Sequence, residues 1–133
     1  DPSLVATVVQ LYIAIAKNPN ATTDLLVKML ASDSPAQRAA ALRSGKLSAG
    51  QKRPYLAKGC AFTDDYELNV IASDPDTPVE VLECLATKPA ASNGLSFNPH
   101  TPTSVLEQMS QSKDWRIANG GKLALSQRQQ QHQ

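Results

Sequence analysis

Three short segments of this chain begin with an Asp or Asn followed by proline, and they align with one another without gaps. They start at Asn18, Asp74 and Asn98. Seven, eight and eleven residues after each start the sequence carries large apolar residues, which are Leu25, Leu26, Met29, Val81, Leu82, Leu85, Val105, Leu106 and Met109. This spacing places each trio on one face of a short helix. Because such a helix cannot bury its apolar face alone, the pattern predicts a stack of similar helical units.

The turn residues of the three segments indicate where each helix ends and the next begins. A proline after each starting residue disfavours helical backbone there, so the preceding helix should stop; these prolines are Pro19, Pro75 and Pro99. The pairs Thr77-Pro78 and Thr101-Pro102 favour threonine as the N-cap and proline as the first helical residue. Glu80 would complete a capping box with Thr77. The first segment lacks a Thr-Pro pair and should cap from a nearby threonine.

The whole chain is predicted to be all-α. We expect helices near residues 3–16, 22–31, 35–44, 64–73, 78–87 and 102–111, with the nine repeated apolar residues in one core closed by residues 4–15. Residues 46–59 contain two glycines and a proline and are expected to be mainly irregular. Residues 114–120 should form the end of a further repeat. The predicted organisation is a single repeat domain over 1–125 and a polar, glutamine-rich tail over 126–133, which is expected to fray.

The segments that start at Asp74 and Asn98 resemble the repeat of the leucine-rich repeat variant (LRV) family, which reads Asn-Pro-x-Thr-Pro-x-x-Val-Leu-x-x-Leu-Ala. The segment that starts at Asn18 fits apart from the Thr-Pro pair. The spacing from Asp74 to Asn98 is 24 residues, the length of that repeat. The residues that carry the resemblance are Asn18, Pro19, Leu26, Asp74, Pro75, Thr77, Pro78, Leu82, Asn98, Pro99, Thr101, Pro102 and Leu106. The resemblance implies a short right-handed α-solenoid, an α-α superhelix of HEAT-like repeats, without catalytic residues. Some family members carry a cysteine-rich iron–sulfur segment, but this chain has only two cysteines, so we expect no cofactor.

The two cysteines, Cys60 and Cys84, are also 24 residues apart. This spacing would allow a disulfide between successive turns, whereas two unpaired thiols are the commoner arrangement, so both alternatives stay open. Cys84 occupies a repeat position that is expected near the surface. The two cysteines do not identify a redox compartment, and we expect a cytoplasmic protein.

Charged residues are arranged in blocks, although the net charge of the chain is only +1. Between Ser34 and Thr63 there are six basic residues and no acid, and from Asp64 to Glu83 there are seven acids and no base. The candidate polar binding surface consists of Arg38, Arg43, Lys46, Lys52, Arg53 and Lys58, with Tyr55 as a stacking group. Such a surface could bind phosphate backbones, whereas neighbouring blocks of opposite charge could also face each other across a turn.

Few other side chains suggest a chemical role. His100 lies at a turn position, where we expect a solvated side chain without catalytic partners. Trp115 could be an exposed binding anchor, but packing within the last turn is the commoner role for a tryptophan. The sequence indicates no metal site and no catalytic set, so we expect a protein that is not an enzyme.

Three functions are compatible with the sequence. A non-enzymatic repeat module that acts as a protein-binding or assembly scaffold is favoured, because the apolar segment 4–16 needs a cover. We expect the first repeat to cover one face and a second chain or a flanking segment to cover the rest; the alternative is a wholly internal helix. The alternatives are nucleic-acid or phosphate-backbone binding through residues 38–58 and a role as accessory domain of a larger enzyme. We expect no membrane partner, since this apolar segment is shorter than the ~20 residues that span a bilayer.

Overall fold

The computed structural model of the chain describes the backbone of residues 2–131 and the side chains in that range other than those of residues 2–6 and 9. Over these residues the protein is helical and contains no strand, which confirms the predicted all-α class. The chain divides into two compact units, Asp1–Tyr55 and Leu56–Gln133. We refer to them as unit 1 and unit 2.

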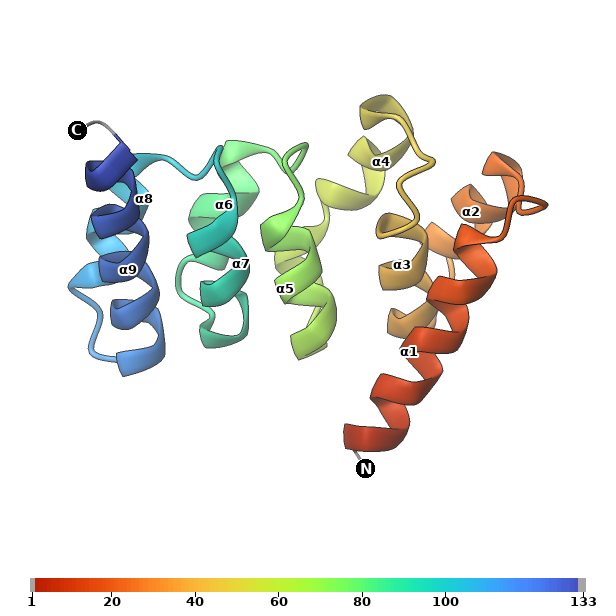
Figure 1. The fold of residues 1–133 in the computed structure, drawn as a ribbon, viewed down its shortest axis with the longest axis horizontal. Coiled ribbons are helices and arrows are strands. Elements are labelled where there is room, and N and C mark those ends of the chain that lie inside the picture. The colour runs from red at the N-terminus through yellow and green to blue at the C-terminus, as the bar shows by residue number, and fades with distance from the viewer. Residues whose placement is uncertain (1, 132–133) are drawn as a thin grey trace. The chain divides into compact units, whose positions relative to one another are not determined.

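Unit 1 contains the first helices of the chain, which Figure 1 labels α1 to α4. The third of them packs against both the first and the second. The helices are α1 (Pro2–Lys17), α2 (Thr23–Leu30), α3 (Pro35–Leu42) and α4 (Ala49–Leu56), the last residue of which belongs to unit 2. The start of α2 is capped as expected by a nearby threonine, since Thr22 Oγ1 accepts a hydrogen bond from Leu25 N at 3.2 Å. Ser34 caps α3 in the same way.

Unit 2 contains a row of three helices, α5, α7 and α9, with α6 and α8 partly hidden behind them in Figure 1. Helix α7 contacts both α5 and α9, and α9 also packs against α8. The elements are η1 (Gly59–Ala61), α5 (Asp65–Ser73), α6 (Val79–Leu85), η2 (Pro89–Ala91), α7 (Ser92–Phe97), α8 (Thr103–Ser110) and α9 (Trp115–Gln131), where η marks a short 3₁₀ turn.

The three Asx-Pro segments share one turn conformation, as their alignment predicts. In each, the carbonyl of the first residue accepts a hydrogen bond from the amide three residues later, at 2.9 Å for Asn18, 3.1 Å for Asp74 and 3.1 Å for Asn98. The side-chain Oδ1 of each also accepts a bond from the amide two residues later, at 2.9, 2.8 and 2.9 Å. These bonds satisfy the carbonyl of each Asx residue and two amides of the turn that follows the helix.

The threonines of the two Thr-Pro pairs do not act as N-caps, so that prediction is wrong. Thr77 Oγ1 donates a hydrogen bond to Ile71 O at 2.6 Å, and Thr101 Oγ1 donates one to Leu95 O at 2.8 Å. Both threonines are buried. Their hydroxyls therefore satisfy a carbonyl at the end of the preceding helix instead of an amide at the start of the next. The proline after each threonine takes the N-cap position without a side-chain bond, and the expected capping box is absent.

A later side chain also donates a hydrogen bond to the same carbonyl of each Asx residue, which the sequence did not predict. The donor lies 28, 24 and 30 residues after the acceptor. The pairs are Lys46 Nζ with Asn18 O, Asn98 Nδ2 with Asp74 O and Arg128 Nη2 with Asn98 O. A side chain from a later segment of the same unit thus holds each turn through a hydrogen bond to its backbone carbonyl.

Eight of the nine repeated apolar residues are buried, as predicted, with exposures of 0–7%. Leu25 is the exception at 42%. At the same offset in the second copy, Val81 is covered by Gly59 of η1, where a Cβ atom would lie 2.8 Å from Val81 Cγ1. The described part of the chain before α2 contains no counterpart of η1, so Leu25 lies open at the edge of unit 1.

Residues 46–59 are not mainly irregular, because α4 occupies Ala49–Leu56. A capping box starts this helix: Gln51 N donates to Ser48 Oγ at 3.2 Å, and Ser48 N donates to Gln51 Oε1 at 2.9 Å. The Ser-x-x-Gln spacing is a helix-start signal that can be read in the sequence. The nearby glycines and Pro54 obscured it, since those residues usually indicate loops.

Helix α9 continues through residues 115–120, where the end of a repeat was expected. It also includes the described part of the glutamine-rich tail, so the expected fraying is absent there. Gly120 and Gly121 do not end this helix. A Cβ atom at Gly121 would lie 2.6 Å from Leu106 O, so the missing side chain allows α9 to approach α8 closely. Arg128 lies in the tail and holds it to α8 by a bond from Nη1 to Thr103 Oγ1 at 3.4 Å.

We expect Gly121→Ala to lower the free energy of unfolding by about 1–3 kcal/mol, because the added methyl forces backbone to move in a close-packed contact. Gly50→Ala is a suitable control, since a Cβ there meets no atom nearer than Ser48 Oγ at 3.9 Å. That change should be neutral or stabilise α4 by up to about 1 kcal/mol through helix propensity. Urea unfolding followed by circular dichroism measures both, and equal stability of Gly121→Ala and the parent chain would contradict the packing.

Candidate functional site

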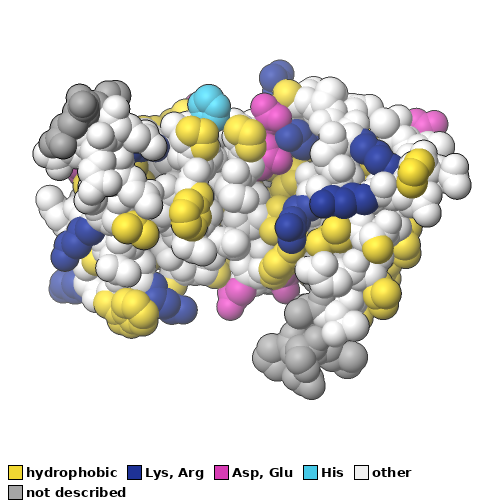
Figure 2. All heavy atoms as spheres, in the orientation of Figure 1, with side chains coloured by type: hydrophobic (Ala, Val, Ile, Leu, Met, Phe, Trp, Pro, Cys, Tyr) yellow, Lys and Arg dark blue, Asp and Glu magenta, His cyan; other side chains and the backbone are white. Residues whose placement is uncertain are grey.

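A hollow in unit 2 lies where α5, η2 and the start of α9 meet. We call it the polar groove; it has a volume of about 630 Å³ and includes Thr63, Asp65, Tyr66, Asn69, Lys88 and Arg116 in its walls. The N-terminal ends of α5 and α9 both point to this edge of the unit (Figure 1). Figure 2 shows charged side chains of both signs along the same edge. The walls thus combine hydroxyl, amide, aromatic and charged groups.

A second hollow of about 380 Å³ adjoins the polar groove and shares Thr87 and Pro89 with it. Its walls include Met109 and Ile117, which are 1% and 4% exposed, together with polar side chains such as Asp114. We call it the second groove. Together the two grooves offer polar and apolar groups side by side on one unit, as protein-binding surfaces do.

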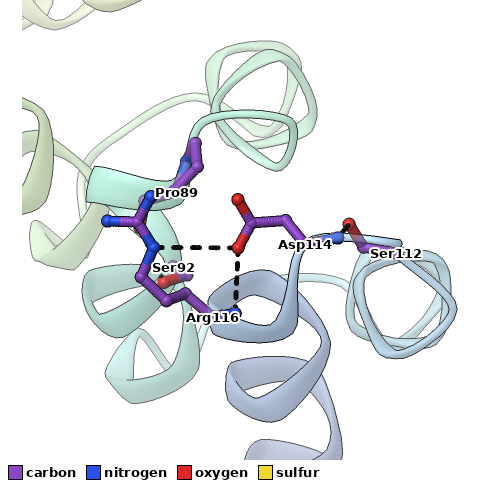
Figure 3. Close-up of polar contacts among 5 residues, drawn as sticks. All are labelled: Pro89, Ser92, Ser112, Asp114 and Arg116. Atoms are coloured by element: carbon purple, nitrogen blue, oxygen red, sulfur yellow. Dashed lines mark hydrogen bonds and ion pairs between the residues drawn. The ribbon is translucent and has the colours of Figure 1, made fainter.

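The start of α9 holds Arg116 at the wall of the polar groove (Figure 3). Asp114 precedes the helix, and its Oδ1 accepts a hydrogen bond from Arg116 N at 2.9 Å and lies 3.7 Å from Arg116 Nε. Ser112 Oγ in turn accepts a bond from Asp114 N at 3.1 Å. A carboxylate at a helix N-terminus is favoured by the helix dipole. This arrangement orients the guanidinium toward the η2 turn that carries Pro89, while the Arg116 side chain remains 56% exposed.

The residues that line the two grooves were not among the binding residues predicted from the sequence. Trp115, the possible anchor, lies outside both linings. Trp115 is 74% exposed, so its expected packing within the last turn is wrong. Lys88, Arg116, Tyr66 and Asn69 come from segments up to 50 positions apart. No local pattern marks them, because the folding of unit 2 brings them together.

The residues of the predicted basic surface are divided between the two units. Lys58 belongs to unit 2, and the others lie in unit 1, which has seven Lys and Arg against three acids. Arg38 Nη1 donates to Ser32 O at 2.8 Å, and Lys46 holds the first Asx turn. Arg43 and Arg53 are exposed, and Figure 2 shows basic side chains over the α3 region. Tyr55 is only 6% exposed, so its ring does not offer a face for stacking.

Cys60 and Cys84 form a disulfide, which answers the question that their spacing left open. The bond joins η1 to α6, with the two Cα atoms 6.1 Å apart. Cys84 is exposed, as its repeat position predicted, and Cys60 is half-buried. His100 is exposed at its turn, also as predicted.

The residues that the structure describes contain no group of three or more His, Cys, Asp or Glu side chains that could hold a metal ion. Within the same part of the chain, no helix has the length and apolar character needed to cross a membrane. Comparisons with protein-family models, curated proteins and solved structures returned no match.

Proposed function

We propose that this chain is a non-enzymatic α-solenoid module that binds another protein through the polar groove of unit 2. The observation that carries the proposal is that the polar groove and the second groove adjoin on one unit and share Thr87 and Pro89. Both hollows are open to the surface, which suits an extended peptide segment better than an enclosed small molecule. Lys88 and Arg116 on the groove wall outnumber its one acid, Asp65, and this balance favours a segment that carries an acidic residue.

The proposal includes the repeat architecture. Three segments share one turn conformation, and eight of the nine residues at equivalent offsets are buried. These observations support LRV-like or HEAT-like repeats, and the proposal takes them as a right-handed solenoid in which exposed edges of successive repeats form a binding surface. The proposed location is the cytoplasm, where disulfides are usually transient and redox-sensing.

Selection from a random peptide library displayed on phage would test protein binding directly. We expect enrichment of peptides with an acidic residue beside an apolar one, bound by the parent chain. Arg116→Glu should weaken the selected peptide by about 10-fold or more, since it reverses a charge at the groove wall. Lys122→Glu is the matched control, because it makes the same charge change at an exposed position of α9 outside the groove. Equal loss in both variants, or no enrichment, would contradict the proposal.

Self-association is a second route to protein binding, favoured by the surface of unit 1. Leu11 and Ile15 of α1 are 61% and 51% exposed, and Ile15 lines a hollow of about 270 Å³ together with Leu25. Exposed apolar patches of this kind often mark interfaces. Sedimentation equilibrium of the parent chain should then show a dimer that Ile15→Lys converts to monomer, whereas a monomeric parent chain would exclude this route.

Nucleic-acid binding is a separate candidate function, favoured by the excess of basic residues in unit 1. Titration of fluorescent duplex DNA and RNA at several salt concentrations would test it. Phosphate contacts predict a linear fall of log affinity with log salt concentration. Arg43→Glu and Arg53→Glu should each reduce both the affinity and this slope.

A further inference from the structure

The Cys60–Cys84 disulfide joins two segments that lead directly into the polar groove. Thr63 follows Cys60 by three residues, Thr87 follows Cys84 by three, and both threonines line the groove. Helix α5, which contributes Tyr66 to the same wall, lies inside the loop that the disulfide closes. The bond therefore joins the two chain segments that lead into the groove walls, one through Thr63 and the other through Thr87.

The segment on the Cys60 side is a single short turn that packs against α6. Element η1 has three residues, and a single turn of 3₁₀ helix is not stable alone. It packs through Gly59, where a Cβ atom would meet Val81 Cγ1 at 2.8 Å and Ile71 Cγ2 at 3.0 Å. At this position η1 contributes only the backbone of a glycine, because a side chain would not fit. The disulfide adds a covalent tie between η1 and α6 to this contact.

The disulfide is also accessible to a reductant. Cys84 is exposed and Cys60 is half-buried, so a thiolate can reach the Cys84 sulfur. A dithiol would attack that sulfur, release the Cys60 thiolate and form a mixed disulfide. Its second thiol would then displace Cys84, leaving the reagent as a cyclic disulfide. Two electrons and two protons pass from the dithiol to the two cysteines.

We infer that the Cys60–Cys84 disulfide is a redox-controlled clamp on the polar groove, closed when oxidised and loosened when reduced by a dithiol. Reduction removes the covalent tie between η1 and α6, so that the segments that follow them into the groove walls no longer hold one separation. Ligand binding then carries the added cost of ordering these walls. The effect on binding rests on the proposed function, whereas the loosening of the segments does not.

Hydrogen exchange measured by mass spectrometry tests the clamp without any ligand. The full chain is compared after treatment with oxidised dithiothreitol and with reduced dithiothreitol. Amides of residues 57–63 and 84–90 should exchange about 10-fold faster or more in the reduced protein, while those of α2 and α3 stay unchanged. In a Cys60→Ser, Cys84→Ser variant the reagent should have no effect. Equal exchange in both states of the parent chain would overturn the inference, as would two free thiols after oxidation.

Peptide affinity provides a second readout. A peptide selected on the oxidised chain should bind the reduced chain at least about 3-fold more weakly, and the double serine variant should not respond to dithiothreitol. Equal affinity in both states would leave protein binding intact and overturn the clamp as its regulator. If no peptide is selected, the proposed function fails, and the exchange experiment alone decides whether the clamp exists.

Discussion

Replacing Leu82 by alanine is expected to lower the free energy of unfolding by about 2–5 kcal/mol. Leu82 is fully buried on α6, at the repeat offset that Leu26 and Leu106 also occupy. Truncation removes apolar contacts and leaves a cavity, because neighbouring helices in a packed core relax only in part.

Val79→Ala is the matched control for Leu82→Ala, since Val79 begins the same helix and is 42% exposed. Its effect should lie within about 0.5 kcal/mol. Urea unfolding of the two variants and the parent chain by circular dichroism gives the comparison. A loss below about 0.5 kcal/mol for Leu82→Ala would show that the repeat register is wrong.

Replacing Asn98 by alanine should cost about 2–4 kcal/mol, because it leaves buried hydrogen-bonding groups without a partner. Asn98 is 1% exposed, and its Nδ2 donates to Ala72 O at 2.8 Å and to Asp74 O at 3.0 Å. Its Oδ1 accepts a bond from His100 N at 2.9 Å. The substitution removes all three bonds and the link between two successive Asx turns.

Asn98→Asp separates the two roles of this side chain. The carboxylate keeps an acceptor for His100 N, as Asp74 does for Asp76 N, but it cannot donate to the carbonyls of the preceding turn. We therefore expect a loss at least as large as that of alanine, since a buried carboxylate would face two carbonyl oxygens. Stability equal to that of the parent chain in either variant would contradict the role of Asn98 as a link between turns.

The candidate site was less predictable than the core. The basic block 38–58 is evident in the sequence, but its members also serve local structure: Arg38 bonds to Ser32 O, and Tyr55 is buried. Arg116 and Lys88 belong to no charged block of the sequence, and only the fold places both in the wall of the polar groove. A charged block reports local composition, whereas a groove depends on which helices pack side by side.

The sequence by itself determined the all-α class, the conformation of the Asx-Pro turns and the burial of the repeated apolar offsets. Each of these depends on interactions between residues close in the chain: proline restricts the residue before it, and apolar spacing selects one helix face. Tertiary structure decided the roles of Thr77 and Gly121, the exposure of Leu25 and Trp115, and the pairing of Cys60 with Cys84. The reason is that these outcomes depend on what lies beside a residue in space, and segments distant in sequence supply it.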